Sequence, residues 1–117
     1  MKERSLREVD PSTLKAWLDR GEALLVDVRE EDEHARERIA GARLLPLSRF
    51  DESRVPHEPG KVLVLQCRSG NRSAQAARRI DGPLGADLYH LAAGIEAWKQ
   101  AGLPVESRSA ERTAAAA

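Results

Sequence analysis

The chain has 117 residues, with 19 basic and 19 acidic side chains, so its formal net charge at pH 7 is zero. This balance excludes the global positive field that attracts nucleic acid, and there is no acidic tail. A chain of this length fits one domain and can bury roughly two thirds of its unfolded surface. We therefore expect neither a two-domain enzyme nor a nucleic-acid partner.

The cysteine and histidine content argues against a disulfide or a metal site. Cys67 is the single cysteine, so no disulfide can form within the chain. The histidines, His34, His57 and His90, lack the spacing of metal ligands, and each is expected on the surface or at a helix end. We expect no metal and no cofactor.

The beginning of the chain does not resemble a secretory signal. Residues 1–7 mix both charges and contain no apolar stretch. No run in the chain approaches the roughly twenty apolar residues of a membrane helix. We therefore expect a cytoplasmic protein with no membrane partner, in a reduced compartment that suits a free thiol.

The first predicted helix opens at Asp10 and Pro11, a good N-cap followed by a proline at the first helical position. Leu14 and Trp17 follow on one helical face, and Gly21 ends the helix. We interpret Trp17 as a core residue.

The next elements alternate between strand and helix. The apolar residues 23–28 predict a buried strand, and the charged run 29–38 predicts a solvated helix. A short strand at 44–45, a helical turn at 48–54 and a loop at 56–60 follow.

The second half of the chain repeats this alternation. A buried strand at 62–66 precedes a helix at 74–80 that is capped by Ser73, and then come a strand at 88–89 and a helix at 94–100. In this last helix the residues predicted to face the sheet are Ile95 and Trp98. Strands that alternate with helices favour an α/β domain with a mostly parallel sheet, in which ligands bind beyond the carboxyl ends of the strands.

The most informative segment begins where the strand at 62–66 gives way to polar residues. A lone cysteine is usually a small buried hydrophobe, but the neighbours of Cys67 suit an anion cradle better than a core. Gly70 permits left-handed backbone angles, and the amides of such a turn can converge beside the positive end of a helix. With Arg68 and Arg72 nearby, a stabilised thiolate and a bound anionic substrate are predicted.

Three segments in the chain follow known signatures in the right order. The loop reads Cys-Arg-Ser-Gly-Asn-Arg-Ser over residues 67–73. An earlier segment combines residues 27–30 with Glu33, Ile39, Gly41, Ala42 and Pro46, and a later one combines Leu91, Gly94, Trp98 and residues 102–104. Together they resemble the rhodanese-like family of thiosulfate sulfurtransferases over about residues 5 to 105.

A few positions depart from the family pattern, and most lie outside the loop. His34 stands where the family usually has tyrosine, and Glu37 with Arg38 where it often has glycine and histidine. Ala40 replaces a common proline, and Ala93 replaces the first of two glycines. These departures affect helix ends and loop geometry more than the chemistry.

The resemblance implies a single rhodanese-like domain over residues 1–105, with a five-stranded, mostly parallel sheet and helices on both faces. Residues 106–117 are small and polar, and we expect a flexible tail there.

The resemblance also implies a set of site residues. Cys67 would be the catalytic nucleophile. Asp27 and Arg29 would play a supporting, structural role, because a carboxylate near a thiolate opposes its ionisation. The residues that would bind the sulfur donor are Arg68, Ser69, Gly70, Asn71, Arg72 and Ser73.

Three functions remain open at this level. The first is a sulfurtransferase that takes sulfur from thiosulfate or another sulfane-sulfur donor and gives it to cyanide, a small thiol or a thioredoxin-like acceptor. The second is a carrier module that delivers a persulfide to a partner protein. The third, a cysteine-dependent phosphatase or arsenate reductase, needs five residues between cysteine and arginine, whereas four separate Cys67 from Arg72.

Overall fold

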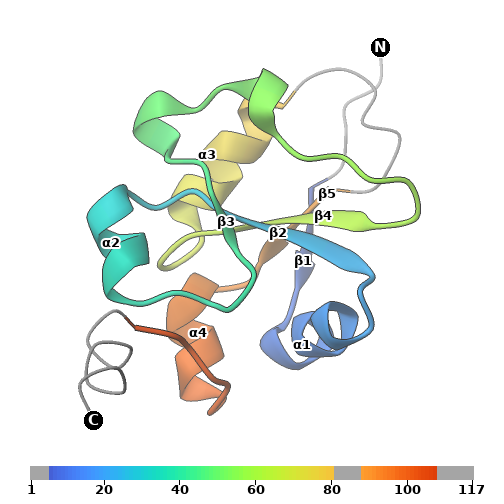
Figure 1. The fold of residues 1–117 in the computed structure, drawn as a ribbon, viewed down its shortest axis with the longest axis vertical. Coiled ribbons are helices and arrows are strands. Elements are labelled where there is room, and N and C mark those ends of the chain that lie inside the picture. Colours follow the sequence, from blue (N-terminus) through green and yellow to red (C-terminus); the bar gives the residue numbers. More distant parts are fainter. Residues whose placement is uncertain (1–5, 81–87, 108–117) are drawn as a thin grey trace, which may run out of the picture.

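The computed structural model describes residues 6–80 and 88–107, and these form an α/β domain around a parallel sheet. The strand order is β1-β5-β4-β2-β3 (Figure 1). The strands are β1 (Leu6–Val9), β2 (Ala23–Asp27), β3 (Arg43–Leu44), β4 (Val62–Gln66) and β5 (Leu88–Leu91). This architecture confirms the predicted fold class.

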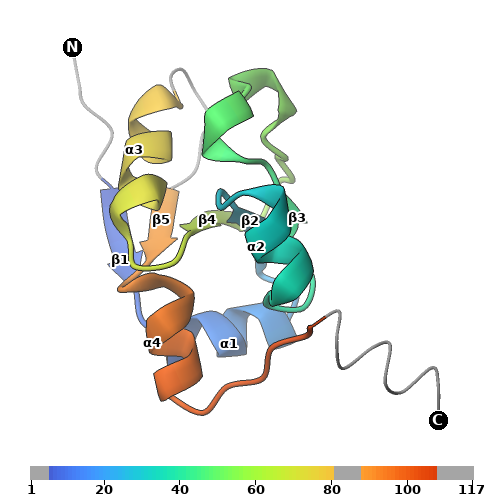
Figure 2. The same ribbon diagram turned by 90° about the vertical axis from the view of Figure 1, so that its left-hand side faces the viewer.

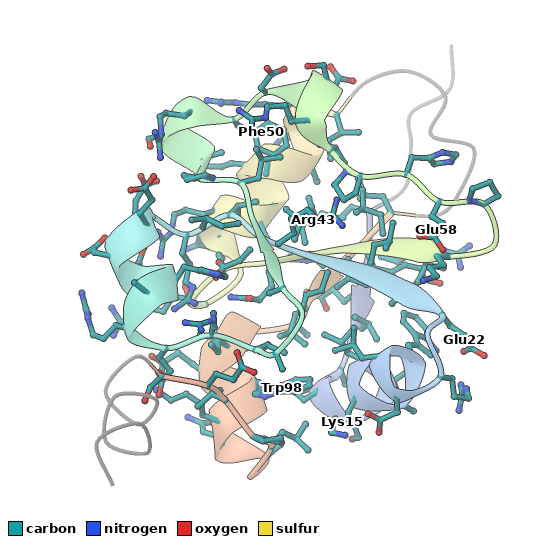
Figure 3. The ribbon with its side chains drawn as sticks, viewed as in Figure 1. Lys15, Glu22, Arg43, Phe50, Glu58 and Trp98 are labelled. Atoms are coloured by element: carbon teal, nitrogen blue, oxygen red, sulfur yellow. The ribbon has the colours of Figure 1, made fainter. Side chains whose placement is uncertain are left out.

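Helices cover both faces of the sheet, as predicted. The helix α3 and two short 3-10 turns lie on one face, and α1 and α4 lie on the other (Figure 2). Figure 3 shows the same separation, with Phe50 on the side of α3 and Trp98 on the side of α4. The helices are α1 (Pro11–Asp19), α2 (Glu31–Arg36), α3 (Asn71–Arg79) and α4 (Gly94–Gln100), and the turns are η1 (Leu47–Arg49) and η2 (Glu52–Arg54).

Local sequence signals explain several boundaries. Asp10 caps α1 as expected, because its Oδ1 accepts a hydrogen bond from the Thr13 amide at 2.8 Å. Pro11 occupies the first helical position, and Gly21 takes a positive φ of 70° just after the helix. The prediction of β4 matches the observed strand, and α4 spans the predicted residues.

Three local predictions need correction. Ser73 is not the N-cap of α3, because the helix begins at Asn71 and Gly70 occupies the cap with φ of 111°. The charged run 29–38 forms a shorter helix, α2. The sequence analysis placed no strand at Leu6–Val9, yet β1 pairs there with β5 in register.

The core is divided into two apolar clusters by the sheet. Val28, Leu65 and Ala76 belong to the cluster under α3, and Leu14, Val64 and Trp98 belong to the cluster on the opposite face. Trp98 is 1 % exposed, which confirms its predicted position in the core. Trp17 is only partly buried, and its ring packs edge-on against Tyr89. The strand β4 and its neighbours β2 and β5 are thus covered on both faces, and this packing holds their carboxyl ends in fixed positions.

The chain after α4 returns to the end of α2. The backbones of Arg38 and Glu106 exchange two hydrogen bonds, of 2.8 and 2.7 Å. The predicted tail comprises residues 106–117, but its first residue, Glu106, is paired with Arg38. Residues 108–117 lie outside the described residues. Within the described ranges, no helix is long and apolar enough to cross a bilayer.

Candidate active site

The candidate site lies where the connections of the sheet diverge. From β2 the chain runs to the edge strand β3, whereas from β4 it runs by way of α3 to β5 on the other side. In parallel sheets such a switch point leaves a crevice beyond the carboxyl ends of the strands, where ligands bind. Cys67 follows β4 directly and therefore stands at this crevice.

The thiol of Cys67 lies inside a cradle of backbone amides. Its Sγ accepts hydrogen bonds from the amides of Gly70 at 3.0 Å and Ser73 at 3.3 Å. Cys67 is 1 % exposed, so these donors replace the water that would otherwise solvate a thiolate. The left-handed φ of Gly70 turns the loop into this cradle.

The first turn of α4 orients the other side of the loop. The amide of Ile95 donates to the Cys67 carbonyl at 2.9 Å, and the amide of Glu96 donates to the Arg68 carbonyl at 3.2 Å. A Cβ on Gly94 would lie 2.3 Å from the Arg68 carbonyl oxygen, so only glycine permits this approach. Because α4 binds these carbonyls, the loop can turn its amides toward the sulfur.

Arg72 is clamped to α2 by Glu33. Its Nη1 and Nη2 donate to the two carboxylate oxygens at 2.7 and 2.9 Å. This bidentate pair holds the pKa of Glu33 at about 2, and it raises the pKa of Arg72. The clamp joins the loop around Cys67 to a helix residue 39 positions earlier in the chain.

Arg68 is also paired, but near the surface. Its Nε lies 3.1 Å from Glu96 Oε2, and the two side chains are 68% and 44% exposed. Beside them a polar hollow of about 280 Å³ lies between α2 and α4. Its lining consists of Arg29, Glu33, Arg36, Glu37, Arg68, Ile95, Glu96 and Lys99.

Asp27 and Arg29 form a buried ion pair at the carboxyl end of β2. Asp27 is fully buried and Arg29 is 4 % exposed, and the guanidinium donates to both carboxylate oxygens at 2.8 to 3.2 Å. His34 Nδ1 lies 2.9 Å from Asp27 Oδ2, and the Arg29 side chain also donates to the Glu37 carbonyl. These contacts fit the structural role expected for Asp27 and Arg29.

The remaining predicted loop residues occupy different environments. Ser69 and Asn71 are exposed, whereas Ser73 is completely buried. The Ser73 hydroxyl lies 3.6 Å from Cys67 Sγ and 2.9 Å from His90 Nδ1. The expectation that His90 lies at the surface is therefore wrong, since it is 7 % exposed within β5, between β1 and β4.

The sequence analysis missed three polar partners of the loop and one partner of Asp27, His34. Glu96 and His90 carried no local signal, because each approaches the loop from another element. Glu33 belonged to the recognised first segment, and that position could have suggested its role. His34 stands where the family usually has tyrosine, and this departure was the available signal.

Comparisons with known proteins agree with this geometry. The profile of the Rhodanese-like domain matches residues 10–101. The chain belongs to the rhodanese-like family. This assignment confirms the resemblance of the loop and of the two flanking segments.

Individual relatives show the same relationship. An uncharacterised protein of Synechocystis is 43% identical over 82% of this chain, and the match covers 54% of that protein. A sulfurtransferase of Allochromatium vinosum is 34% identical over 86% of this chain and 94% of its own length. The crystal structure of a Pseudomonas aeruginosa thiosulfate sulfurtransferase has a TM-score of 0.76 at 26% identity, covering 91% of this chain and 20% of that one. The chain thus spans about half or less of two of these three proteins.

Proposed function

We propose that this protein is a sulfurtransferase that uses Cys67 as the nucleophile and thiosulfate as the donor. The Cys67 thiolate attacks the outer sulfur of thiosulfate, a new sulfur–sulfur bond forms, and sulfite leaves with the electron pair of the broken bond. The persulfide then gives its outer sulfur to cyanide or to an external thiol, because the chain has no second cysteine. Neither half-reaction needs a cofactor.

The amide cradle is the observation that supports this proposal most directly. Donors from Gly70 and Ser73 already converge on Cys67 Sγ, and amides in the same loop can stabilise the negative charge of a persulfide. Because Cys67 is only 1% exposed, its sulfur is shielded from oxidants in solution. A relative named sulfurtransferase is similar to this protein in sequence over 86% of this chain.

The donor preference follows from charge. Thiosulfate carries two negative charges and mercaptopyruvate one, so Arg68 and Arg72 beside the thiolate favour thiosulfate. The phosphatase alternative is disfavoured by the short spacing, since only four residues separate Cys67 from Arg72. A carrier role uses the same persulfide and differs only in its acceptor.

Intact-mass measurement tests the proposal. Incubation with thiosulfate should add one sulfur, about 32 mass units, to the wild-type chain and none to Cys67→Ser. Cyanide should then remove that mass and release thiocyanate with repeated turnover. A folded wild-type chain whose mass stays unchanged would exclude the sulfurtransferase function, whereas a persulfide that resists cyanide but moves to a dithiol protein would favour the carrier.

A further inference from the structure

His90 is a buried titratable side chain whose two ring nitrogens both meet polar groups. Its Nδ1 lies 2.9 Å from the Ser73 hydroxyl, and its Nε2 lies 3.5 Å from Glu8 Oε2. Glu8 and His90 are direct cross-strand partners in the β1–β5 pair. The polar contacts of the ring thus come from α3 on one side and from β1 on the other.

These contacts extend from the buried nucleophile to the surface. The Ser73 hydroxyl is 3.6 Å from Cys67 Sγ, and Cys67, Ser73 and His90 are all less than one tenth exposed. The Glu8 side chain is 67% exposed. A continuous series of polar atoms therefore connects a sulfur that is shielded from water with a carboxylate in solvent.

We propose that Ser73 and His90 form a proton relay that converts Cys67 to its thiolate, with His90 as a positioning residue that acts through the Ser73 hydroxyl. This inference rests on the proposed function, because it describes how the nucleophile of that reaction is prepared.

The relay needs no movement of heavy atoms. In the thiol state, Sγ–H donates to Ser73 Oγ, and the Ser73 hydroxyl donates to His90 Nδ1. The Sγ–H bond breaks as an Oγ–H bond forms, and the original Oγ–H bond breaks as Nδ1–H forms. One proton has then moved from Cys67 to His90, and no oxidant or reductant is required.

The product state has the better hydrogen bonds for a thiolate. Protonated His90 donates from Nδ1 to Ser73 Oγ, so the only hydroxyl proton of Ser73 can point at Sγ. The thiolate then has a third donor beside the amides of Gly70 and Ser73. The Glu8 carboxylate near Nε2 stabilises the imidazolium charge.

One contact competes with the relay. The Ser73 hydroxyl also lies 3.1 Å from the Gly70 carbonyl, which can accept its proton. The Ser73 hydroxyl therefore has three possible acceptors for its one proton: the Cys67 sulfur, His90 Nδ1 and the Gly70 carbonyl. Which acceptor the hydroxyl points to depends on the protonation of His90. A change of the ring that removes Nδ1 leaves the hydroxyl free to turn to Gly70, away from the sulfur.

The experiment measures alkylation of Cys67 against pH, without any sulfur donor. His90→Leu and Ser73→Ala should each move the rate profile to higher pH and slow alkylation at pH 7 about three- to tenfold. The double variant should be no slower than Ser73→Ala, because His90 acts only through Ser73. His90→Asn, which keeps a polar group near the position of Nδ1 but cannot take up a proton, should alkylate as slowly as His90→Leu.

The matched control is His57→Leu, which changes an exposed histidine away from the loop and should alkylate like the wild type. The relay is overturned if folded His90→Leu keeps the wild-type profile, or if the effects of the two single changes add in the double variant. Structural damage alone would lower the melting temperature without this dependence on Ser73.

A second measurement applies if His90→Leu does not fold. In the wild type, the His90 ring is titrated by NMR before and after Cys67 is capped with a neutral methylthio group. Coupling between two sites is reciprocal, so capping should make His90 lose its proton at lower pH. An unchanged His90 titration would overturn the relay. Since neither measurement uses thiosulfate, a protein that takes up no sulfur would refute the proposed function while leaving the relay tested separately.

Discussion

At the scale of single residues, the two loop arginines are occupied by carboxylates. Arg72 forms a bidentate pair with the partly buried Glu33, whereas the Arg68–Glu96 pair is exposed. Exposed ion pairs contribute little free energy and exchange readily. An anionic donor can therefore displace Glu96 from Arg68 far more easily than it can displace Glu33 from Arg72.

We therefore expect Glu96→Gln and Arg68→Ala to change the Michaelis constant for thiosulfate in opposite directions. Glu96→Gln should lower it about two- to threefold at low salt, because Arg68 loses its competitor, and Arg68→Ala should raise it several-fold. Glu58→Gln, which removes the same charge far from the loop, is the matched control. Steady-state kinetics at low and high salt test the idea, and equal constants for Glu96→Gln and Glu58→Gln would contradict it.

The lowered pKa of Glu33 predicts that the free energy of unfolding depends on pH. Its pKa is lowered to about 2 in the folded protein, below the ordinary value of 4.5, so its contribution is present above pH 4.5 and is lost as the pH falls toward 2. Glu33→Gln should lower the free energy of unfolding at pH 7 by about 1 kcal/mol and flatten its slope in that window.

Urea unfolding at a series of pH values measures this slope. Asp32→Asn, which removes an exposed carboxylate from the same helix, should change the free energy of unfolding by less than about 0.5 kcal/mol. A Glu33→Gln slope equal to that of the wild type would show that the clamp does not govern acid stability.

At the scale of elements, the join between the loop and α4 depends on two residues with left-handed backbones. Ala93 has φ of 57°, and Gly94 has φ of 65° with no space for a Cβ. Left-handed angles cost an L-residue about 1 to 2 kcal/mol, but Ala93 has replaced the glycine common in the family. The two positions are therefore matched in conformation and differ in the space around them.

Ala93→Gly should raise the free energy of unfolding by about 0.5 kcal/mol, since relief of strain exceeds the added freedom of the unfolded chain. Gly94→Ala should lower it by about 3 kcal/mol or more, because its Cβ would collide with the backbone of Arg68 and Cys67. Thermal unfolding distinguishes these outcomes. If Gly94→Ala were as stable as the wild type, the close approach of α4 would not be required.

The elements that the sequence predicted well are those with local signals. The residues that cap α1 lie within a few positions of one another, and the same is true of the apolar run of β4 and of the loop around Cys67. By contrast, β1 has only one buried residue, Val9, and offers no hydrophobic pattern. It forms because β5 presents a free edge to it.

The partners of the site were harder to predict for the same reason. Glu33 reaches Arg72 across 39 positions, Glu96 reaches Arg68 across 28, and His90 reaches Ser73 across 17. His90 looked like a surface residue because its burial depends on the strand order, which places β5 between β1 and β4. Such contacts follow from topology, which no local pattern of residues encodes.

At the scale of the whole molecule, the C-terminal segment joins α4 to the chain that follows α2. After α4, Trp98 Nε1 donates to the Pro104 carbonyl at 2.8 Å, and the Glu106 backbone then pairs with Arg38. A Lys99–Glu37 ion pair of 2.8 Å connects α4 to the end of α2. The segment thus links the helix that orients the loop carbonyls to the helix that clamps Arg72.

Two truncations test this link. A chain that ends at Val105 loses both backbone hydrogen bonds and the Arg38–Glu106 ion pair, and its free energy of unfolding should fall by about 1 to 2 kcal/mol. A chain that ends at Ser107 keeps these contacts and should stay within about 0.5 kcal/mol of the full chain if residues 108–117 form the predicted tail. Both truncations end in a new carboxylate, so terminal charge cannot explain a difference between them.

Urea unfolding gives the free energies of the two truncations. Cys67 alkylation at pH 7 should slow only in the shorter chain, because loosening α4 lets the loop amides turn away from the sulfur. Equal stability of the two truncations would show that the pairing of Glu106 with Arg38 does not stabilise the domain.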